Sequence, residues 1–228
     1  MRVERYRRSV VEDTTVIDIP RADDEDATTE TLGSWAARSA VLMPFGRVLY
    51  RLARMVEGSV VEFGTGSGVS AAYLSAGLER AGGDGRVVSV EAHPVLAERA
   101  EANLRSSGFH GVTVVLGQER EVAPNLLETV EPALVHVDSG HLYPDTAGLA
   151  ELVAGHLDSV VVCYDDIRWS PDMARFWGEA CGGRFRVSHA VDLDLWGVVL
   201  VGPGAAGPAQ LLHARAPTQF KGAELVDG

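Results

Sequence analysis

The chain has 228 residues, and its 32 acidic and 20 basic side chains give a formal net charge of −12 at neutral pH. This length, with 46% hydrophobic residues, is typical of one domain with a single full core. The negative charge argues against nucleic acid as a partner. Two cysteines in no metal-like spacing, no signal pattern and no run that could cross a membrane predict a soluble, reduced, cytoplasmic protein.

The beginning of the chain carries an acidic cluster. Residues 1–30 include the run RADDEDATTE and show little apolar periodicity, so they are expected to form a solvated arm or a mobile cover. From residue 31 onward apolar side chains recur at helical spacing, and a second helical pattern follows Pro44. A single domain that starts with two helices is therefore predicted over residues 31–202.

Strand and helix patterns then alternate along the chain. Five apolar, β-branched runs fit strands buried on both faces of a parallel sheet: residues 59–63, 86–91, 112–117, 133–138 and 159–166. Residues 184–192 and 195–202 predict two more strands, joined by too few residues for a parallel crossover. The predicted fold is α/β, with a Rossmann-like doubly wound sheet of five parallel strands, a C-terminal strand pair including an antiparallel strand, and helices on both faces. A tail rich in Gly, Pro and Ala is expected over residues 203–228.

The first predicted strand runs into the glycine-rich stretch VVEFGTGSGVS. Gly64, Gly66 and Gly68 allow a ligand to approach unpaired backbone N–H groups at the start of a helix. Glu91 ends the second predicted strand, where a carboxylate can take both hydroxyls of a ribose. A tight turn and a simple helix cap are the alternative interpretations. Val69 replaces the third glycine of the dinucleotide fingerprint, which weakens the hypothesis of an NAD-linked reductase.

Acidic side chains follow the fourth and fifth predicted strands. Asp138, Asp165 and Asp166 are expected at the carboxyl edge, where open α/β sheets bind ligands. Three neighbouring carboxylates repel one another unless a cation or a proton intervenes, and oxygen ligands suit Mg²⁺. Capping of the loop that follows is the alternative for the pair at 165–166.

A histidine and several aromatic residues lie near the same edge. His141 is placed to take a proton from a hydroxyl near neutral pH, although a structural histidine is an equal alternative. Tyr143, Tyr164 and Trp169 are expected to form an aromatic wall for the acceptor. His136 falls inside the fourth predicted strand and is expected in the core.

The ordered motifs VVEFGTGSG and VVSVEAHP, with five alternating units and a terminal strand pair, resemble the class I methyltransferases that bind S-adenosylmethionine. The similarity spans about residues 44–202. The resemblance implies that Glu62 and the three glycines surround the amino-acid part of the cofactor and that Glu91 binds its ribose. It also implies that Gln118 and Glu119, in the segment LGQERE, border the adenine.

The acidic residues resemble those of catechol-type and sugar or antibiotic-tailoring O-methyltransferases. That resemblance implies that Asp138, Asp165 and Asp166 hold a divalent metal that chelates the acceptor hydroxyls. It also implies that Asp138 contacts the cofactor and shares catalysis with His141, in a segment, DSGHLY, similar to a DGDHSY motif. Gly140 stands where that motif often has a second acid, so a requirement for metal stays open.

The expected function is therefore transfer of a methyl group from S-adenosylmethionine to a hydroxyl of a small molecule, with or without Mg²⁺. Methyl transfer to nitrogen or carbon without metal is one alternative, and a non-catalytic S-adenosylmethionine-binding protein is another. No membrane or nucleic acid is expected as a partner, and formation of a homo-oligomer is left open.

Overall fold

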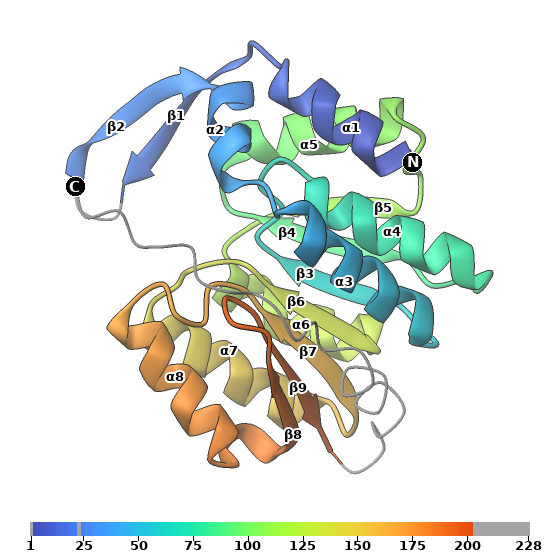
Figure 1. The fold of residues 1–228 in the computed structure, drawn as a ribbon, viewed down its shortest axis with the longest axis vertical. Helices are drawn as coiled ribbons and strands as arrows, with labels where there is room; N and C mark the ends of the chain where they lie inside the picture. The colour runs from blue at the N-terminus through green and yellow to red at the C-terminus, as the bar shows by residue number, and fades with distance from the viewer. Residues whose placement is uncertain (1, 22–23, 203–228) are drawn as a thin grey trace.

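The computed structural model describes residues 2–21 and 24–202. Its helices (Figure 1) are α1 (Arg2–Val11), α2 (Leu32–Ser39), α3 (Met43–Met55), α4 (Val69–Ala81), α5 (Pro94–Ser106), α6 (Glu119–Val130), α7 (Tyr143–His156), α8 (Pro171–Cys181) and the short 3₁₀ helix η1 (Arg184–Arg186). Its strands are β1 (Val16–Arg21), β2 (Asp24–Thr31), β3 (Val60–Phe63), β4 (Val87–Glu91), β5 (Val112–Leu116), β6 (Leu134–Val137), β7 (Val160–Tyr164), β8 (Val187–Asp192) and β9 (Gly197–Val201).

One large sheet organises the molecule. Its strands lie in the order β5-β4-β3-β6-β7-β9-β8, and the five strands from β3 to β7 are mutually parallel. Strand β9 pairs antiparallel with both β7 and β8, so the last two strands form a hairpin at one edge of the sheet. The five predicted parallel strands, the terminal pair and the Rossmann-like fold class are confirmed.

The central strands are apolar because both faces of the sheet are covered. Val60 points into a hydrophobic cluster with side chains of α1, α3 and α4, whereas the next residue, Val61, packs into a second cluster with α6, α7 and α8. Successive side chains of a strand point to opposite faces, so a strand buried on both sides has no polar alternation. Each face of the sheet therefore carries its own helical layer.

The N-terminal segment differs from the expected solvated arm. Helix α1 buries Val3, Tyr6 and Val10, which lie on one face of the helix and join the core cluster of α3 and α4. This spacing is helical, but the acidic composition of the segment that follows concealed it. Strands β1 and β2 pair antiparallel and project from the molecule beside α2 (Figure 1). The predicted tail, residues 203–228, lies outside the described residues.

The carboxyl ends of the parallel strands share one edge of the sheet. The glycine-rich loop after β3 lies there between the end of β4 and the loop that follows β6, because β3 pairs with both strands. The loop after β7 is next in order. In an open α/β sheet, ligands bind at this edge. None of the helices in the described part of the chain is long and apolar enough to span a membrane.

Candidate functional site

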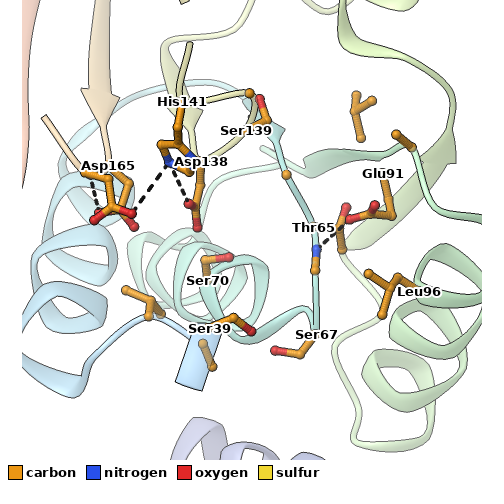
Figure 2. A pocket seen from close by; sticks show the side chains of 18 of the residues that line it. Ser39, Thr65, Ser67, Ser70, Glu91, Leu96, Asp138, Ser139, His141 and Asp165 are labelled. Atoms are coloured by element: carbon orange, nitrogen blue, oxygen red, sulfur yellow. Dashed lines mark hydrogen bonds and ion pairs between the residues drawn. The ribbon is translucent and has the colours of Figure 1, made fainter. Parts of the chain in front are cut away.

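A cavity of about 780 Å³ lies at the carboxyl edge of the sheet (Figure 2). Its walls come from the glycine loop, from the ends of β4, β5, β6 and β7, from the α2–α3 connection and from the β8–β9 turn. One end of the cavity holds the glycine loop and Glu91. The other end holds Asp138, His141, Asp165 and Asp166, so the two sets of predicted residues are brought together in one space.

The glycine loop has backbone geometry that side chains would obstruct. Gly64 has φ of +99°, and a Cβ there would lie 2.1 Å from the backbone oxygen of Asp138 at the end of β6. Gly66 has φ of +51°, and a Cβ there would lie 2.9 Å from the ring of Trp35 in α2. Only glycine fits both positions without displacement. The loop therefore lies against the strand end, and α2 closes over it.

Glu91 connects the loop to the end of β4. Its side chain accepts a hydrogen bond from the backbone N–H of Gly66 at 2.8 Å and another from that of His93 at 2.9 Å. The residue is only 9% exposed, and it lines the cavity (Figure 2). A carboxylate that already accepts from two donors fixes the loop conformation and presents its remaining lone pairs to the cavity. The N-cap of α5 is His93 and not Glu91, and the role of Glu91 as a ribose ligand stays a prediction.

Glu62 and Gly68 do not reach the cavity. The carboxylate of Glu62 is fully buried, accepts a hydrogen bond from Ser89 at 2.5 Å and contacts Nδ1 of His136 at 3.0 Å. Gly68 is the N-cap of α4 and donates its N–H to the backbone oxygen of Thr65 at 2.8 Å. Neither belongs to the residues that line the cavity. Contrary to what the resemblance implied, Glu62 and Gly68 therefore do not contact the cavity, and instead they support the glycine loop from beneath. His136 is in the core, as predicted.

Gln118 and Glu119 line the cavity beyond Glu91, at the start of α6. The carboxylate of Glu119 accepts a hydrogen bond from the hydroxyl of Ser139, which lies in the loop after β6. Burial raises the pKa of Glu119 above its ordinary value, against the opposing effect of that hydrogen bond. The segment after β5 thus forms the wall next to the glycine loop, where the family resemblance implies that it should lie.

At the opposite end, His141 stands between two carboxylates (Figure 2). Its Nε2 lies 3.7 Å from Oδ1 of Asp138 and 3.8 Å from Oδ2 of Asp166. The same atom is buried and has no hydrogen-bond partner in the described part of the chain. Burial lowers the pKa of His141, although the charge of Asp166 opposes this shift. A neutral imidazole with a free ring nitrogen is therefore aimed into the site.

The three aspartates repel one another. Burial, followed by the charge of Asp165, raises the pKa of Asp138 well above its usual range. Burial and the charge of Asp166 raise the pKa of Asp165 to about 6, and burial also raises that of Asp166. Because their pKa values are raised, these carboxylates favour a nearby positive charge or a bound proton.

A magnesium site would need the carboxylates of Asp138, Asp165 and Asp166 to converge on one ion. Asp165 turns one oxygen back to the backbone N–H of Asp166, 2.7 Å away, and His141 fills the space between Asp138 and Asp166. Among the described residues no three His, Cys, Asp or Glu side chains have their donor atoms placed to share one ion. Magnesium needs oxygens converging in near-octahedral geometry, so the present arrangement of these residues does not fit it.

Of the three predicted aromatic residues, only Trp169 lines the cavity, and it is 73% exposed. Tyr164 is 3% exposed and packs edge-on against Phe176 in the core, 4.8 Å between ring centroids. It is the last residue of β7, a strand whose side chains are all buried. The prediction that Tyr164 forms part of the acceptor wall is wrong, because its side chain lies in the core.

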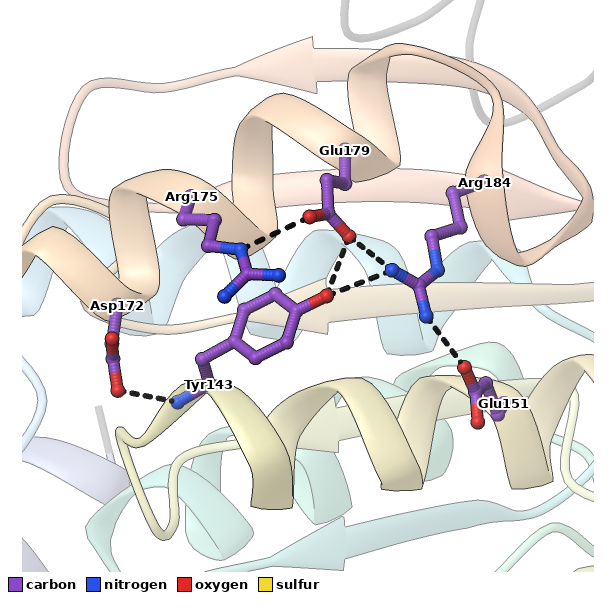
Figure 3. Close-up of polar contacts among 6 residues, drawn as sticks. All are labelled: Tyr143, Glu151, Asp172, Arg175, Glu179 and Arg184. Carbon is purple, nitrogen blue, oxygen red and sulfur yellow. Dashed lines mark hydrogen bonds and ion pairs between the residues drawn. The ribbon is translucent and has the colours of Figure 1, made fainter.

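Tyr143 is also outside the cavity. Its hydroxyl donates to Glu179 at 2.6 Å, and the guanidinium carbon of Arg175 lies 3.7 Å from the ring centroid (Figure 3). Arg184 reaches the same carboxylate and hydroxyl, and its other nitrogen contacts Glu151. These contacts join α7 to α8 and η1 on the outer surface. The prediction that Tyr143 forms part of the acceptor wall is therefore wrong, because its side chain connects α7 to α8 and η1 instead.

Several residues that line the cavity were not predicted. Trp35, Leu42 and Phe45 come from α2, α3 and their connection, and Leu195 and Trp196 come from the β8–β9 turn. The aromatic residues of these helices were visible in the sequence as part of an apolar periodicity. Which connection closes over a sheet edge depends on tertiary packing, and no local spacing signals it.

Comparisons with known proteins identify methyltransferases as similar to this chain. Residues 61–167 match the family model described as a methyltransferase domain. Protein-L-isoaspartate O-methyltransferase of Nitrobacter winogradskyi is 37% identical over 102 residues, which cover 43% of this chain and 44% of that relative. The match with this curated relative thus spans less than half of its length.

Solved structures show the same fold. Cofactor-bound Rv0187 from MTB has 25% identity and a TM-score of 0.62, with 72% of this chain and 82% of the other covered. The O-methyltransferase TomG of Streptomyces achromogenes, solved with S-adenosylmethionine and involved in tomaymycin synthesis, has 22% identity and a TM-score of 0.60, with 89% and 100% covered. The predicted resemblance and fold class are confirmed by these comparisons.

Proposed function

We propose that this chain, whose residues 61–167 match a methyltransferase domain and whose fold is that of class I methyltransferases, transfers a methyl group from S-adenosylmethionine to a hydroxyl of a small molecule. One observation carries the proposal: a single cavity joins the glycine loop and Glu91 at one end to the unpartnered Nε2 of His141 at the other. Binding at a glycine loop and proton removal at a hydroxyl are the two operations that such a transfer needs.

The cofactor end is assigned to residues that line the cavity beside the loop. The open backbone at Gly64 and Gly66 would hold the amino-acid part, Glu91 the ribose hydroxyls, and Gln118 with Glu119 the adenine. A Cβ at Gly66 would enter this space beside Trp35, which supports the idea of a cradle kept free for a ligand. Bound S-adenosylmethionine supplies an electrophilic methyl group on a positively charged sulfur.

The acceptor end is assigned to His141 and its acidic neighbours. The imidazole is neutral near pH 7 because burial lowers its pKa, so Nε2 can take the proton of the acceptor hydroxyl. The acceptor oxygen forms the new bond to the methyl carbon, and the electron pair of the broken bond stays on sulfur. Asp166, whose charge acts on the ring, stabilises the imidazolium that results.

No magnesium is required by this proposal, because the aspartates do not present a converging ligand set. Exhaustive treatment with a chelator should leave turnover unchanged, with elemental analysis to verify that no metal is retained. Loss of turnover on chelation and its return on addition of Mg²⁺ would instead mean that Asp138, Asp165 and Asp166 rearrange around the ion. Affinity for S-adenosylhomocysteine, measured on the same samples, separates an effect on the acceptor end from an effect on the cofactor end.

A second candidate is methylation of a carboxylate, which the partial match to protein-L-isoaspartate O-methyltransferases favours. Transfer to nitrogen or carbon and a purely binding role are further alternatives. Mass spectrometry of reactions with phenolic, amine and isoaspartyl-peptide acceptors distinguishes them. The proposal expects a methyl ether as product. A methyl ester, an N-methyl or C-methyl product, or binding of S-adenosylhomocysteine with no transfer would contradict it.

A further inference from the structure

The acceptor end of the cavity has an apolar mouth. Leu42, Trp169 and Leu195 all line the cavity, yet they expose 57%, 73% and 41% of their surface. They belong to three separate segments: the start of α3, the loop after β7 and the β8–β9 turn. Large apolar side chains gathered around an opening commonly mark a surface that a ligand covers.

Flat aromatic surface lies behind this mouth. The rings of Phe45 and Trp196 stack with centroids 5.2 Å apart and planes 9° apart. Both residues line the cavity, but Trp196 is only 1% exposed and also stacks on His136, with ring centroids 5.2 Å apart, so Phe45 is the accessible ring of the pair. Aromatic side chains favour another ring in stacked or edge-on contact. The wall thus suits a planar acceptor.

The charge of the cavity restricts the acceptor further. Six carboxylates line the cavity, Glu91, Glu119, Asp138, Asp145, Asp165 and Asp166, against two arginines, Arg38 and Arg120. Arg38 is already held by Glu30 through contacts of 2.7 and 3.0 Å. Arg120 follows Glu119 in the segment after β5, and its charge acts on that carboxylate. The acceptor end therefore holds three aspartates, and among the described residues no arginine forms an ion pair with them.

We infer that the acceptor, if the proposed methyl transfer is right, is an aromatic molecule whose hydroxyl is methylated and which carries no negative charge. A neutral or cationic phenol places its ring against Phe45 and its hydroxyl at Nε2 of His141. A carboxylate there meets three acidic side chains in a partly buried space, where charge repulsion is only weakly screened. The same repulsion excludes the side chain of an isoaspartyl residue as the preferred acceptor.

The test uses three phenols that differ only at the end of a two-carbon chain: tyramine is cationic, tyrosol is neutral and phloretic acid is anionic. Methyl transfer to each is measured as kcat/KM, with an isoaspartyl peptide as a fourth acceptor. Tyramine and tyrosol should exceed phloretic acid by about 10-fold or more, because the carboxylates that line the cavity together repel the anionic end of the acceptor. Equal or better use of phloretic acid or of the peptide would overturn the inference.

Two variants test the mouth itself. Leu42→Ala and Trp169→Ala should each raise KM for tyrosol several-fold, with affinity for S-adenosylhomocysteine unchanged. Leu116→Ala is the matched control, because Leu116 is 56% exposed and lies outside the cavity lining. Unchanged KM in both variants, or no transfer to any of the three phenols, would overturn the inferred acceptor class. Failure of the wild-type protein to bind S-adenosylhomocysteine would instead refute the proposed function on which the inference rests.

Discussion

At the scale of single residues, the role proposed for His141 depends on an unusual backbone conformation. Its backbone φ is +42°, in the left-handed region, and Gly140 before it also has positive φ, +74°. Asp138 directly follows β6, and the turn after it directs the imidazole of His141 back toward the Asp138 carboxylate. Positive φ at a residue other than glycine costs about 1 kcal/mol or more and is common where a side chain has to be aimed into a site.

Replacement of His141 tests its role as the base. His141→Asn is the suitable variant, because asparagine tolerates positive φ better than alanine does. The kcat should fall by roughly 10²- to 10⁴-fold, since general-base catalysis is lost, while affinity for S-adenosylhomocysteine stays unchanged. His110→Ala, at an exposed position, serves as the control. A fall in kcat no larger than that of the control would show His141 to be structural.

The aspartate cluster makes a prediction about pH and stability. The pKa of Asp165 is raised to about 6, so the protonated form is favoured in the folded state and its stabilising effect is lost as pH rises through that value. Asp165→Asn imitates the protonated form and keeps an oxygen for the N–H of Asp166. Chemical denaturation should show a gain of about 1 to 3 kcal/mol at alkaline pH and little change in acid, below the ordinary pKa of an aspartate.

The control for this measurement is Asp194→Asn, at an exposed position in the β8–β9 turn where φ is +75°. Asparagine tolerates that conformation, so the change in the free energy of unfolding should be within about 0.5 kcal/mol at either pH. If Asp165→Asn destabilised the protein at alkaline pH, the carboxylate would be needed in its charged form, and the account of mutual repulsion would be wrong.

At the scale of elements, α1 supports the glycine loop from below. The hydroxyl of Tyr6 donates a hydrogen bond to the backbone oxygen of Ser67 at 2.7 Å, and a Cβ at Gly68 would lie 2.8 Å from the same hydroxyl. Tyr73 of α4 donates to Glu4 of α1, which fixes the helix at a second point. The N-terminal helix thus belongs to the site, although it contributes no residue to the cavity lining.

Removal of the Tyr6 hydroxyl tests how much this hydrogen bond to the glycine loop contributes to stability and to cofactor binding. Tyr6→Phe leaves the oxygen of Ser67 buried without its donor, which should destabilise the protein by about 1 to 3 kcal/mol and weaken binding of S-adenosylhomocysteine several-fold. Tyr73→Phe removes a hydrogen bond of α1 as well, but away from the loop, so it should lower thermal stability without affecting affinity. Equal affinities in the two variants, by calorimetry, would limit α1 to a role in stability.

The elements also show where sequence patterns were sufficient. Apolar β-branched runs predicted β3 to β7 because strands buried on both faces carry no alternation, and the short link between the last two strands predicted the hairpin. Helix α1 was missed although Val3, Tyr6 and Val10 have helical spacing. A short amphipathic helix is stable only through tertiary contacts, so its sequence alone gave a weak signal beside an acidic cluster.

At the scale of the whole molecule, strand order determines which site residues meet. Neighbouring carboxyl ends bring the loops after β3, β4, β6 and β7 to one edge, so the aspartates, His141 and Glu91 could be predicted to lie near one cavity. The structural roles of Glu62, Tyr143 and Tyr164 could not be predicted in this way. Whether a side chain at a strand end turns into the cavity or into the core depends on one residue of register and on distant partners such as Glu179.

Nor could the cover of the cavity be predicted. The α2–α3 connection and the β8–β9 turn lie far apart in the chain, and the stacked rings of Phe45 and Trp196 join them. Contacts between such distant segments leave no periodic pattern in the sequence. The acceptor class inferred above therefore depends on the structure, whereas the cofactor class was already indicated by the motifs.

The central claim is that the glycine loop is a cradle for S-adenosylmethionine, and calorimetric titration with S-adenosylhomocysteine tests it most directly. The wild-type protein should bind one equivalent. Gly66→Val should abolish binding, because a side chain at φ of +51° would occupy the space between the loop and Trp35. A thermal unfolding transition retained in the variant would verify that the fold survives. Absence of binding to the wild type, or equal binding to a folded Gly66→Val variant, would contradict the account.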